Sequence, residues 1–161
     1  MKDKYSLTIL FWSISFIAYS WLHEAGHFAV LLLSGISTDQ MEIAWAKVPI
    51  IPVSINVSGV EVPQIVYFAG GFMAGLSFLL LSFVFRRIYK KKMQEEFWWL
   101  FAISLGFVGA GFTEFVVEGF FTKYHGVVLE QIFVYVITFI IPSLLIAWHY
   151  RSRILDWYKT R

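Results

Sequence analysis

The chain has 161 residues, of which 58% are hydrophobic, 20% aromatic and only 15% charged, so its composition predicts a membrane domain and excludes an ordinary soluble one. The formal net charge of +2 is too small to indicate nucleic acid binding. The chain has no cysteine, which excludes disulfides and thiolate metal sites, so a metal ion would need histidine and carboxylate ligands. We expect a single all-α membrane domain extending over residues 1–161.

Four apolar segments are each close to, or longer than, the roughly 20 residues that a helix needs to cross the hydrocarbon core of a membrane. They extend over about residues 6–34, 64–89, 97–121 and 127–149. The first is too long for the apolar region of a signal peptide and lacks a small-residue cleavage pattern, so we expect it to be retained as a spanning helix. Pro142 is predicted to kink the fourth helix, which membrane helices tolerate.

The first predicted helix carries the motif HEAGH at residues 23–27. Positions i and i+4 share a helix face, so His23 and His27 can bind one metal ion while Glu24 lies beside them as a general base. Ionisable groups at membrane depth are costly and are normally retained for function, which disfavours a chance match. The motif therefore predicts a zinc hydrolase site with His23 and His27 as metal ligands and Glu24 as the catalytic residue.

The segment between the first two helices has a different pattern. Apolar and polar residues alternate with period two over residues 53–58 and more loosely over residues 41–48. We expect two short strands around Pro49 and Pro52, forming a small β-element between helices 1 and 2. The alternative is an irregular interfacial loop anchored by Trp45.

A catalytic zinc site needs a third protein ligand and an open position for water. The candidates within a span, away from the basic edge, are Glu114 and Glu118, which are four residues apart and share a helix face. His125 and Glu130 lie near a boundary and His149 lies at the opposite face of the membrane. We do not expect these last three residues to bind the metal.

The histidines and the two glutamates lie at matching depths. His23 follows Lys4 by almost as many residues as Glu114 follows Glu96, and the second member of each pair lies four residues farther along. At about 1.5 Å of rise per residue, both pairs then reach the same level of the membrane. We predict that the four side chains form one metal site.

The basic residues predict the orientation of the chain. All but two of the 13 lysines and arginines lie before the first span, between the second and third, or after the fourth. The exceptions are Lys47 and Lys123. By the positive-inside rule we expect a multi-pass integral membrane protein with both termini in the cytoplasm.

The order of these features resembles the site-2 protease family of intramembrane zinc metalloproteases, particularly its short members. HEAGH is followed by a strand-rich segment, by Ala69-Gly70-Gly71 in the second helix and by a carboxylate in the third, so the resemblance covers roughly residues 21–126. It implies a zinc metalloendopeptidase that hydrolyses peptide bonds within or near transmembrane segments of membrane-protein substrates. It also implies Zn2+ as the cofactor, His23 and His27 as its ligands and Glu24 as the catalytic base.

The third ligand follows less directly from the resemblance. The family commonly has an Asn-Pro-containing run that ends in Leu-Asp-Gly, whereas this chain has no Asn-Pro and its nearest match is Val117-Glu118-Gly119. Other zinc hydrolases that follow HExxH with two acids four apart use the first as ligand and the second to support a histidine. That comparison favours Glu114 as the ligand, with Glu118 as the alternative or as a partner of a histidine. The predicted orientation also places the site away from the cytoplasm, whereas well-known relatives often place it nearer the cytoplasm.

Two other classes of function stay open at this level. The chain could be a non-proteolytic metal-binding membrane protein, such as a transporter subunit or a sensor, although transport would favour more polar groups along several spans. It could also be an inactive homologue that binds transmembrane segments, which the intact Glu24 disfavours. In the proteolytic case the partners are the lipid bilayer and a membrane-protein substrate, and the predicted strands offer an edge on which an extended substrate can pair.

Overall fold

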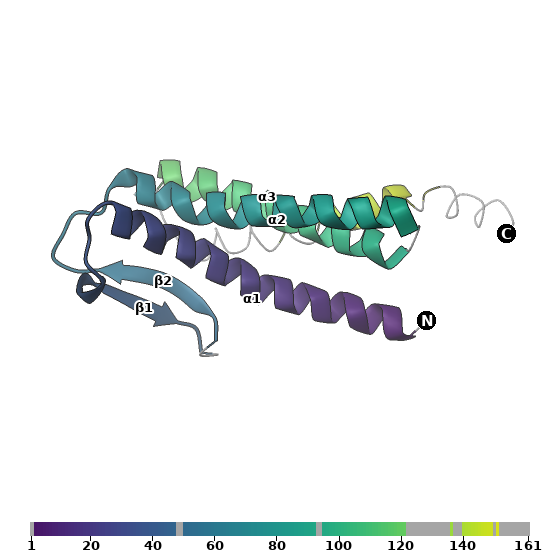
Figure 1. Cartoon of the computed structure of the whole chain (residues 1–161), viewed down its shortest axis with the longest axis horizontal. Helices are drawn as coiled ribbons and strands as arrows, with labels where there is room; N and C mark the ends of the chain where they lie inside the picture. The colour runs from purple at the N-terminus through teal and green to yellow at the C-terminus, as the bar shows by residue number, and fades with distance from the viewer. Residues whose placement is uncertain are drawn as a thin grey trace, which may run out of the picture.

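The structure of the chain, a computed structural model, describes residues 2–47, 50–92, 95–121, 136, 140–149 and 151. Three long helices lie side by side, with a two-stranded sheet against one end of the bundle (Figure 1). They are α1 (Lys2–Leu33), α2 (Gln64–Lys92) and α3 (Glu95–Phe121).

Each long helix contains a stretch that is long and apolar enough to cross a membrane, Ile9–Leu33 in α1, Gln64–Lys91 in α2 and Phe97–Phe120 in α3. The mostly helical class is therefore confirmed, and three of the four predicted spans form helices of sufficient length and apolar composition. Of the fourth predicted span, the structure describes the short apolar helix Ile140–His149, and most of the remainder lies outside the described residues.

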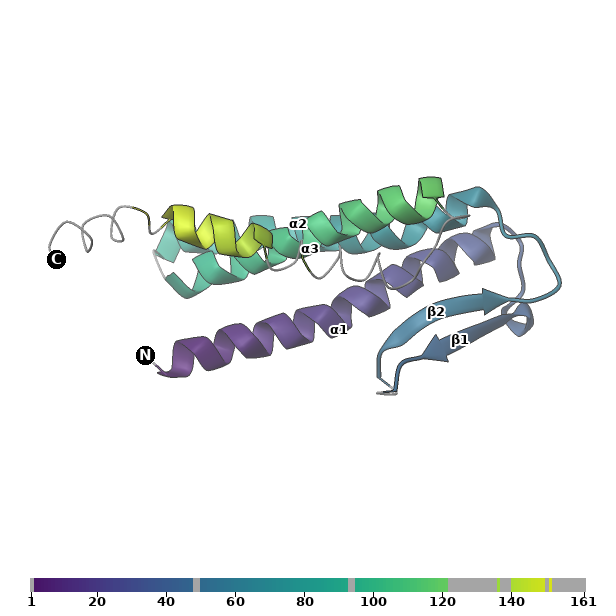
Figure 2. The same ribbon diagram turned by 180° about the vertical axis from the view of Figure 1, so that it is seen from behind.

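α1 and α3 run in the same direction, and α2 runs in the opposite direction (Figures 1 and 2). The bundle interior is a cluster of buried apolar side chains in which Phe78 stacks on Phe107, with ring centroids 4.7 Å apart. Large apolar side chains such as Leu80, Phe83 and Phe112 are exposed on the outside. A bilayer would cover such side chains, so their exposure agrees with a lipid-embedded bundle.

Glycines bring α2 and α3 into close contact. A Cβ on Gly111 would lie 2.6 Å from the Cα of Gly75, a separation that real Cβ atoms do not adopt. The two backbones can approach this closely only without a side chain at Gly111, as in other membrane helix pairs that use small residues.

The end of α1 is set by Gly35, whose φ of 81° is in the left-handed region. The N–H of Gly35 donates to the carbonyl of Leu32 and that of Ile36 to the carbonyl of Leu31, at 3.0 and 3.1 Å. This is the Schellman pattern, and the accompanying apolar contact is present because Ile36 belongs to the same buried cluster as Leu31. The turn directs the chain back along α1.

The returning chain forms the antiparallel strands β1 (Met41–Trp45) and β2 (Pro52–Val57), with Ile43 opposite Ile55 and an irregularity next to Trp45. The predicted β-element is confirmed, and the segment does not form the irregular loop that was the alternative. Pro52 begins β2, a position at which proline removes no interior ladder hydrogen bond.

The hairpin packs along the half of α1 that carries the HEAGH motif (Figure 2). The indole N–H of Trp21 donates to the carbonyl of Ile50 at 2.9 Å, and the ring of Trp21 meets that of Trp45 edge to face at 5.6 Å. At the other end of the hairpin, Ile55 and Val57 pack against the cluster that contains Leu31. β2 therefore covers the motif.

Candidate metal centre

The motif lies on an uninterrupted stretch of α1, which places His23 and His27 one above the other on one helix face. His23 and Glu24 are buried, each with 7% of its surface exposed, and His27 is partly buried. The Nε2 atoms of the two imidazoles are 2.9 Å apart. The spacing predicted from the sequence is therefore present, and both rings direct the same nitrogen toward one point.

The other ring nitrogens are held by neighbouring acceptors. Nδ1 of His27 lies 2.7 Å from the carbonyl oxygen of Val66, which can only accept, so Nδ1 carries the hydrogen. Nδ1 of His23 lies 2.7 Å from Oε2 of Glu114, which is an ion-pair distance, but it makes no hydrogen bond among the described residues. His27 is then left with a lone pair on Nε2, the form of histidine that binds metals, and the negative charge of Glu114 favours the same form of His23.

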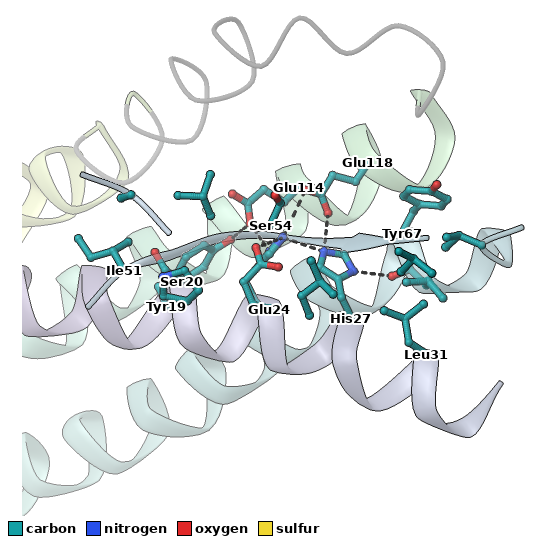
Figure 3. A pocket seen from close by; sticks show the side chains of 18 of the residues that line it. Tyr19, Ser20, Glu24, His27, Leu31, Ile51, Ser54, Tyr67, Glu114 and Glu118 are labelled. Atoms are coloured by element: carbon teal, nitrogen blue, oxygen red, sulfur yellow. Dashed lines mark hydrogen bonds and ion pairs between the residues drawn. The ribbon is translucent and has the colours of Figure 1, made fainter. Parts of the chain in front are cut away.

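The two glutamates occupy different sides of these rings. Glu118 faces both Nε2 atoms, with Oε1 3.3 Å from His23 and Oε2 3.3 Å from His27. Glu114 lies on the Nδ1 side of His23, where it also accepts a hydrogen bond from the hydroxyl of Tyr19 at 2.5 Å (Figure 3). The group that can hold a metal ion consists of His23, His27 and Glu118.

This geometry therefore favours Glu118 as the third ligand, whereas the sequence favoured Glu114. The structure brings Glu118, the named alternative, to the position that faces both Nε2 atoms, and gives Glu114 the supporting position. The reason is that residues four apart share a helix face but lie one turn apart along the helix, so each reaches a different level of α1. Glu114 is level with Tyr19 and His23, whereas Glu118 lies between the two histidines.

The donor atoms fit a tetrahedral cation in both spacing and chemistry. Ligand atoms about 2.0 to 2.1 Å from a tetrahedral zinc ion lie about 3.3 Å from one another. Here the two Nε2 atoms are 2.9 Å apart, and each lies 3.3 Å from one oxygen of Glu118, Oε1 for His23 and Oε2 for His27. Two imidazole lone pairs and a carboxylate oxygen are all electron-rich, so their convergence is favourable only when a positive charge lies among them.

Glu24 lies beside this group without belonging to it. Its Oε1 is 4.0 Å from Nε2 of His23, and its buried Oε2 has no hydrogen-bond partner in the described part of the chain. A buried carboxylate oxygen needs such a partner, which a water molecule or a substrate can supply. Glu24 thus has the placement of a proton acceptor next to a metal site.

A cavity of about 600 Å³ opens on these side chains. Residues of α1, β2, α2 and α3 line it, and its apolar part includes Leu31 and Ile51 (Figure 3) as well as Ile55. Cavities of this size accommodate small molecules or a short stretch of peptide. The polar groups are concentrated at one place, formed by Glu24, the two histidines and the two glutamates.

Sequence reasoning missed two groups that hold the histidines. Tyr19 is four residues before His23, so helical spacing could have signalled its place on the same face. The carbonyl of Val66 has no signal in the sequence, because any residue would supply the same backbone atom. Of the histidines and acids set aside, His149 stacks on Trp98 with centroids 4.3 Å apart, and His125 and Glu130 lie outside the described residues.

No model of a known protein family, no curated protein and no solved structure matches this chain. Function is therefore argued from the chemistry of the site itself.

Proposed function

We propose that the protein is an intramembrane zinc metalloprotease of the site-2 protease type, which hydrolyses peptide bonds within or near transmembrane segments of other proteins. One observation carries the proposal. Three electron-rich donors from His23, His27 and Glu118 converge within an apolar helix bundle, and Glu24, whose Oε2 has no hydrogen-bond partner among the described residues, lies next to them at a cavity. A hydrolase needs a carboxylate in that place to take a proton from water.

The residues would divide the work as follows. Zinc held by His23, His27 and Glu118 would supply Lewis acidity to a water molecule and to the substrate carbonyl. Glu24 takes a proton from the water molecule as the water oxygen bonds to the carbonyl carbon of the substrate. Glu24 then gives this proton to the peptide nitrogen as the C–N bond breaks. Glu114, held by Tyr19, fixes the ring of His23, and the carbonyl of Val66 fixes that of His27.

The cavity supports an extended, apolar substrate. β1 occupies one edge of β2, while residues of β2 from Pro52 to Ile55, together with Val57, line the cavity. A transmembrane helix hides its carbonyls in internal hydrogen bonds, so it has to unwind before hydrolysis. The other edge of β2, which pairs with no strand in the described part of the chain, then offers main-chain hydrogen bonds to the unwound segment.

The proposal is tested with purified protein in detergent. We expect about one zinc ion per chain, and cleavage of a transmembrane peptide that stops on addition of a chelator and returns with zinc. His23→Ala should lose both the metal and the activity, because two protein ligands hold zinc poorly. A wild-type protein free of zinc would overturn the metal centre, and zinc without cleavage of any transmembrane peptide would favour the sensor or transporter alternative.

We also propose four spans with both termini in the cytoplasm, which puts the metal centre in the outer half of the membrane. Since the chain has no cysteine, Lys91→Cys and Asp39→Cys each introduce a single thiol at an exposed position. We expect a membrane-impermeant thiol reagent to label Lys91→Cys from the cytoplasmic side and Asp39→Cys from the other side. Labelling after permeabilisation is the control, and the reverse pattern would invert the orientation without affecting the zinc site.

A further inference from the structure

The backbone of α2 passes directly beside the two imidazoles at Gly70. A Cβ placed on this residue would lie 2.7 Å from Nε2 and 2.8 Å from Cε1 of His23, and it would also collide with Nε2 of His27. These are the same two nitrogens that converge with Glu118. Gly70 is not among the residues that line the cavity, and we call the side of the group that it contacts the closed side.

A second glycine, inside the motif, produces this close approach. A Cβ on Gly26 would collide with the carbonyl oxygen of Ala69 and would lie 3.0 Å from Cβ of Met73. The helices α1 and α2 therefore cross in backbone contact between the two histidines. This crossing brings Gly70, the neighbour of Ala69, against the Nε2 atoms.

We propose that Gly70 determines whether the centre can hold a metal ion, because its missing side chain leaves the volume that the ion needs beside both Nε2 atoms. The inference rests on the proposed metal centre. A zinc ion lies about 2.0 to 2.1 Å from each ligand nitrogen. The methyl carbon of an alanine at this position would lie only slightly farther from the same two nitrogens. It would occupy the volume that the ion needs, so the centre can hold the methyl group or the ion but not both.

The closed side also gives the centre a direction. With the backbone of Gly70 against the imidazoles, and His23, His27 and Glu118 available as three ligands, a bound ion would have its remaining position on the side of the cavity and Glu24. A catalytic zinc site needs such an open position on the side where substrate arrives.

The other glycines of α2 differ in what they contact. A Cβ on Gly71 would lie 2.6 Å from the carbonyl oxygen of Gly111 and would collide with the backbone N of Phe115, so Gly71 serves helix packing. A Cβ on Gly75 would meet its nearest atom, Cα of Gly111, at 3.5 Å, which is ordinary contact. At Gly70 the obstructing atoms are the ends of side chains. An alanine there can be accommodated when the imidazoles turn, which separates the donors but leaves the helices in place.

The test compares wild type with Gly70→Ala, Gly71→Ala and Gly75→Ala. Zinc affinity is measured by competition with a chelator, the ligand geometry by the visible spectrum of the Co2+ form, and the fold by thermal unfolding of the metal-free proteins. For Gly70→Ala we expect the metal-free protein to unfold at the same temperature as the wild type. We expect its zinc Kd to rise by about 10- to 100-fold or more, since the loss of a supporting contact alone has an effect of that size. Gly71→Ala should lower the unfolding temperature, and Gly75→Ala should resemble wild type in all three measurements.

Wild-type zinc affinity and an unchanged Co2+ spectrum in Gly70→Ala would overturn the inference while leaving the metal centre standing. Metal-free Gly70→Ala that unfolds as early as Gly71→Ala would also overturn it, because the residue would then serve packing. A wild-type chain that binds no zinc would remove the centre and the inference together. Zinc binding without proteolysis would remove the proposed protease, and the inference would still be decided by the affinity of Gly70→Ala.

Discussion

Glu24→Gln is expected to abolish peptide-bond hydrolysis and to leave zinc content and fold unchanged. The amide has nearly the same shape as the carboxylate, but it cannot take a proton from water at neutral pH. General-base catalysis contributes about 100- to 10,000-fold, so we expect turnover to fall by at least that factor. Because Oε2 of Glu24 makes no hydrogen bond in the described part of the chain, the amide breaks no contact seen there.

The measurements are the rate of peptide cleavage, the zinc content and the thermal unfolding of the variant. Glu42→Gln is a matched control, since it makes the same chemical change on an exposed residue of β1 outside the cavity. It should behave like wild type. Cleavage by Glu24→Gln at a rate near that of wild type would remove the proposed mechanism, whatever the zinc content.

Glu118→Gln is expected to leave the protein nearly free of zinc, whereas Glu114→Gln should keep zinc with about 10- to 100-fold weaker affinity. The carboxylate of Glu118 faces both Nε2 atoms, so its loss removes a ligand and the negative charge that offsets the ion. Of the two histidines, Glu114 contacts only His23, at Nδ1, so its loss frees that ring to rotate but leaves three donors. Zinc titration of both variants under identical conditions gives the ranking.

The two substitutions are chemically identical and lie one turn apart on α3, so each controls for the other. If Glu114→Gln were metal-free and Glu118→Gln retained zinc, Glu114 would be the ligand, as the spacing of the two acids first suggested. If neither variant lost zinc, the third ligand would have to lie elsewhere in the chain.

The convergence of the four ionisable groups was predictable because it depends on few variables. α1 and α3 run in the same direction, and both rise by the same distance per residue. Equal numbers of residues therefore reach equal depth, and the pairing of His23 with Glu114 follows from counting. The long helices and the hairpin were predictable for similar reasons, since apolar length and period-two alternation are local properties of the sequence.

The ranking of the two glutamates was not predictable in this way. Each imidazole has two nitrogens, and the position of α3 relative to α1 decides which carboxylate faces Nδ1 and which faces Nε2. That position depends on contacts between helices, such as the close approach of Gly111 to Gly75. The contributions of Val66 and Gly70 were equally hidden, because a carbonyl oxygen and an absent side chain leave no pattern in one sequence.

The hairpin that covers the motif contributes no donor to the centre. The donors come from α1 and α3, and their described supports come from the three long helices. β2 supplies only a wall of the cavity, and the hydrogen bond between Trp21 and Ile50 lies just before the start of this strand. The hairpin as a whole lies between Gly35 and Gly59, both in the left-handed region. In the proposed protease, the hairpin would therefore receive the polypeptide while the long helices hold the ion, so that the two tasks fall to separate parts of the molecule.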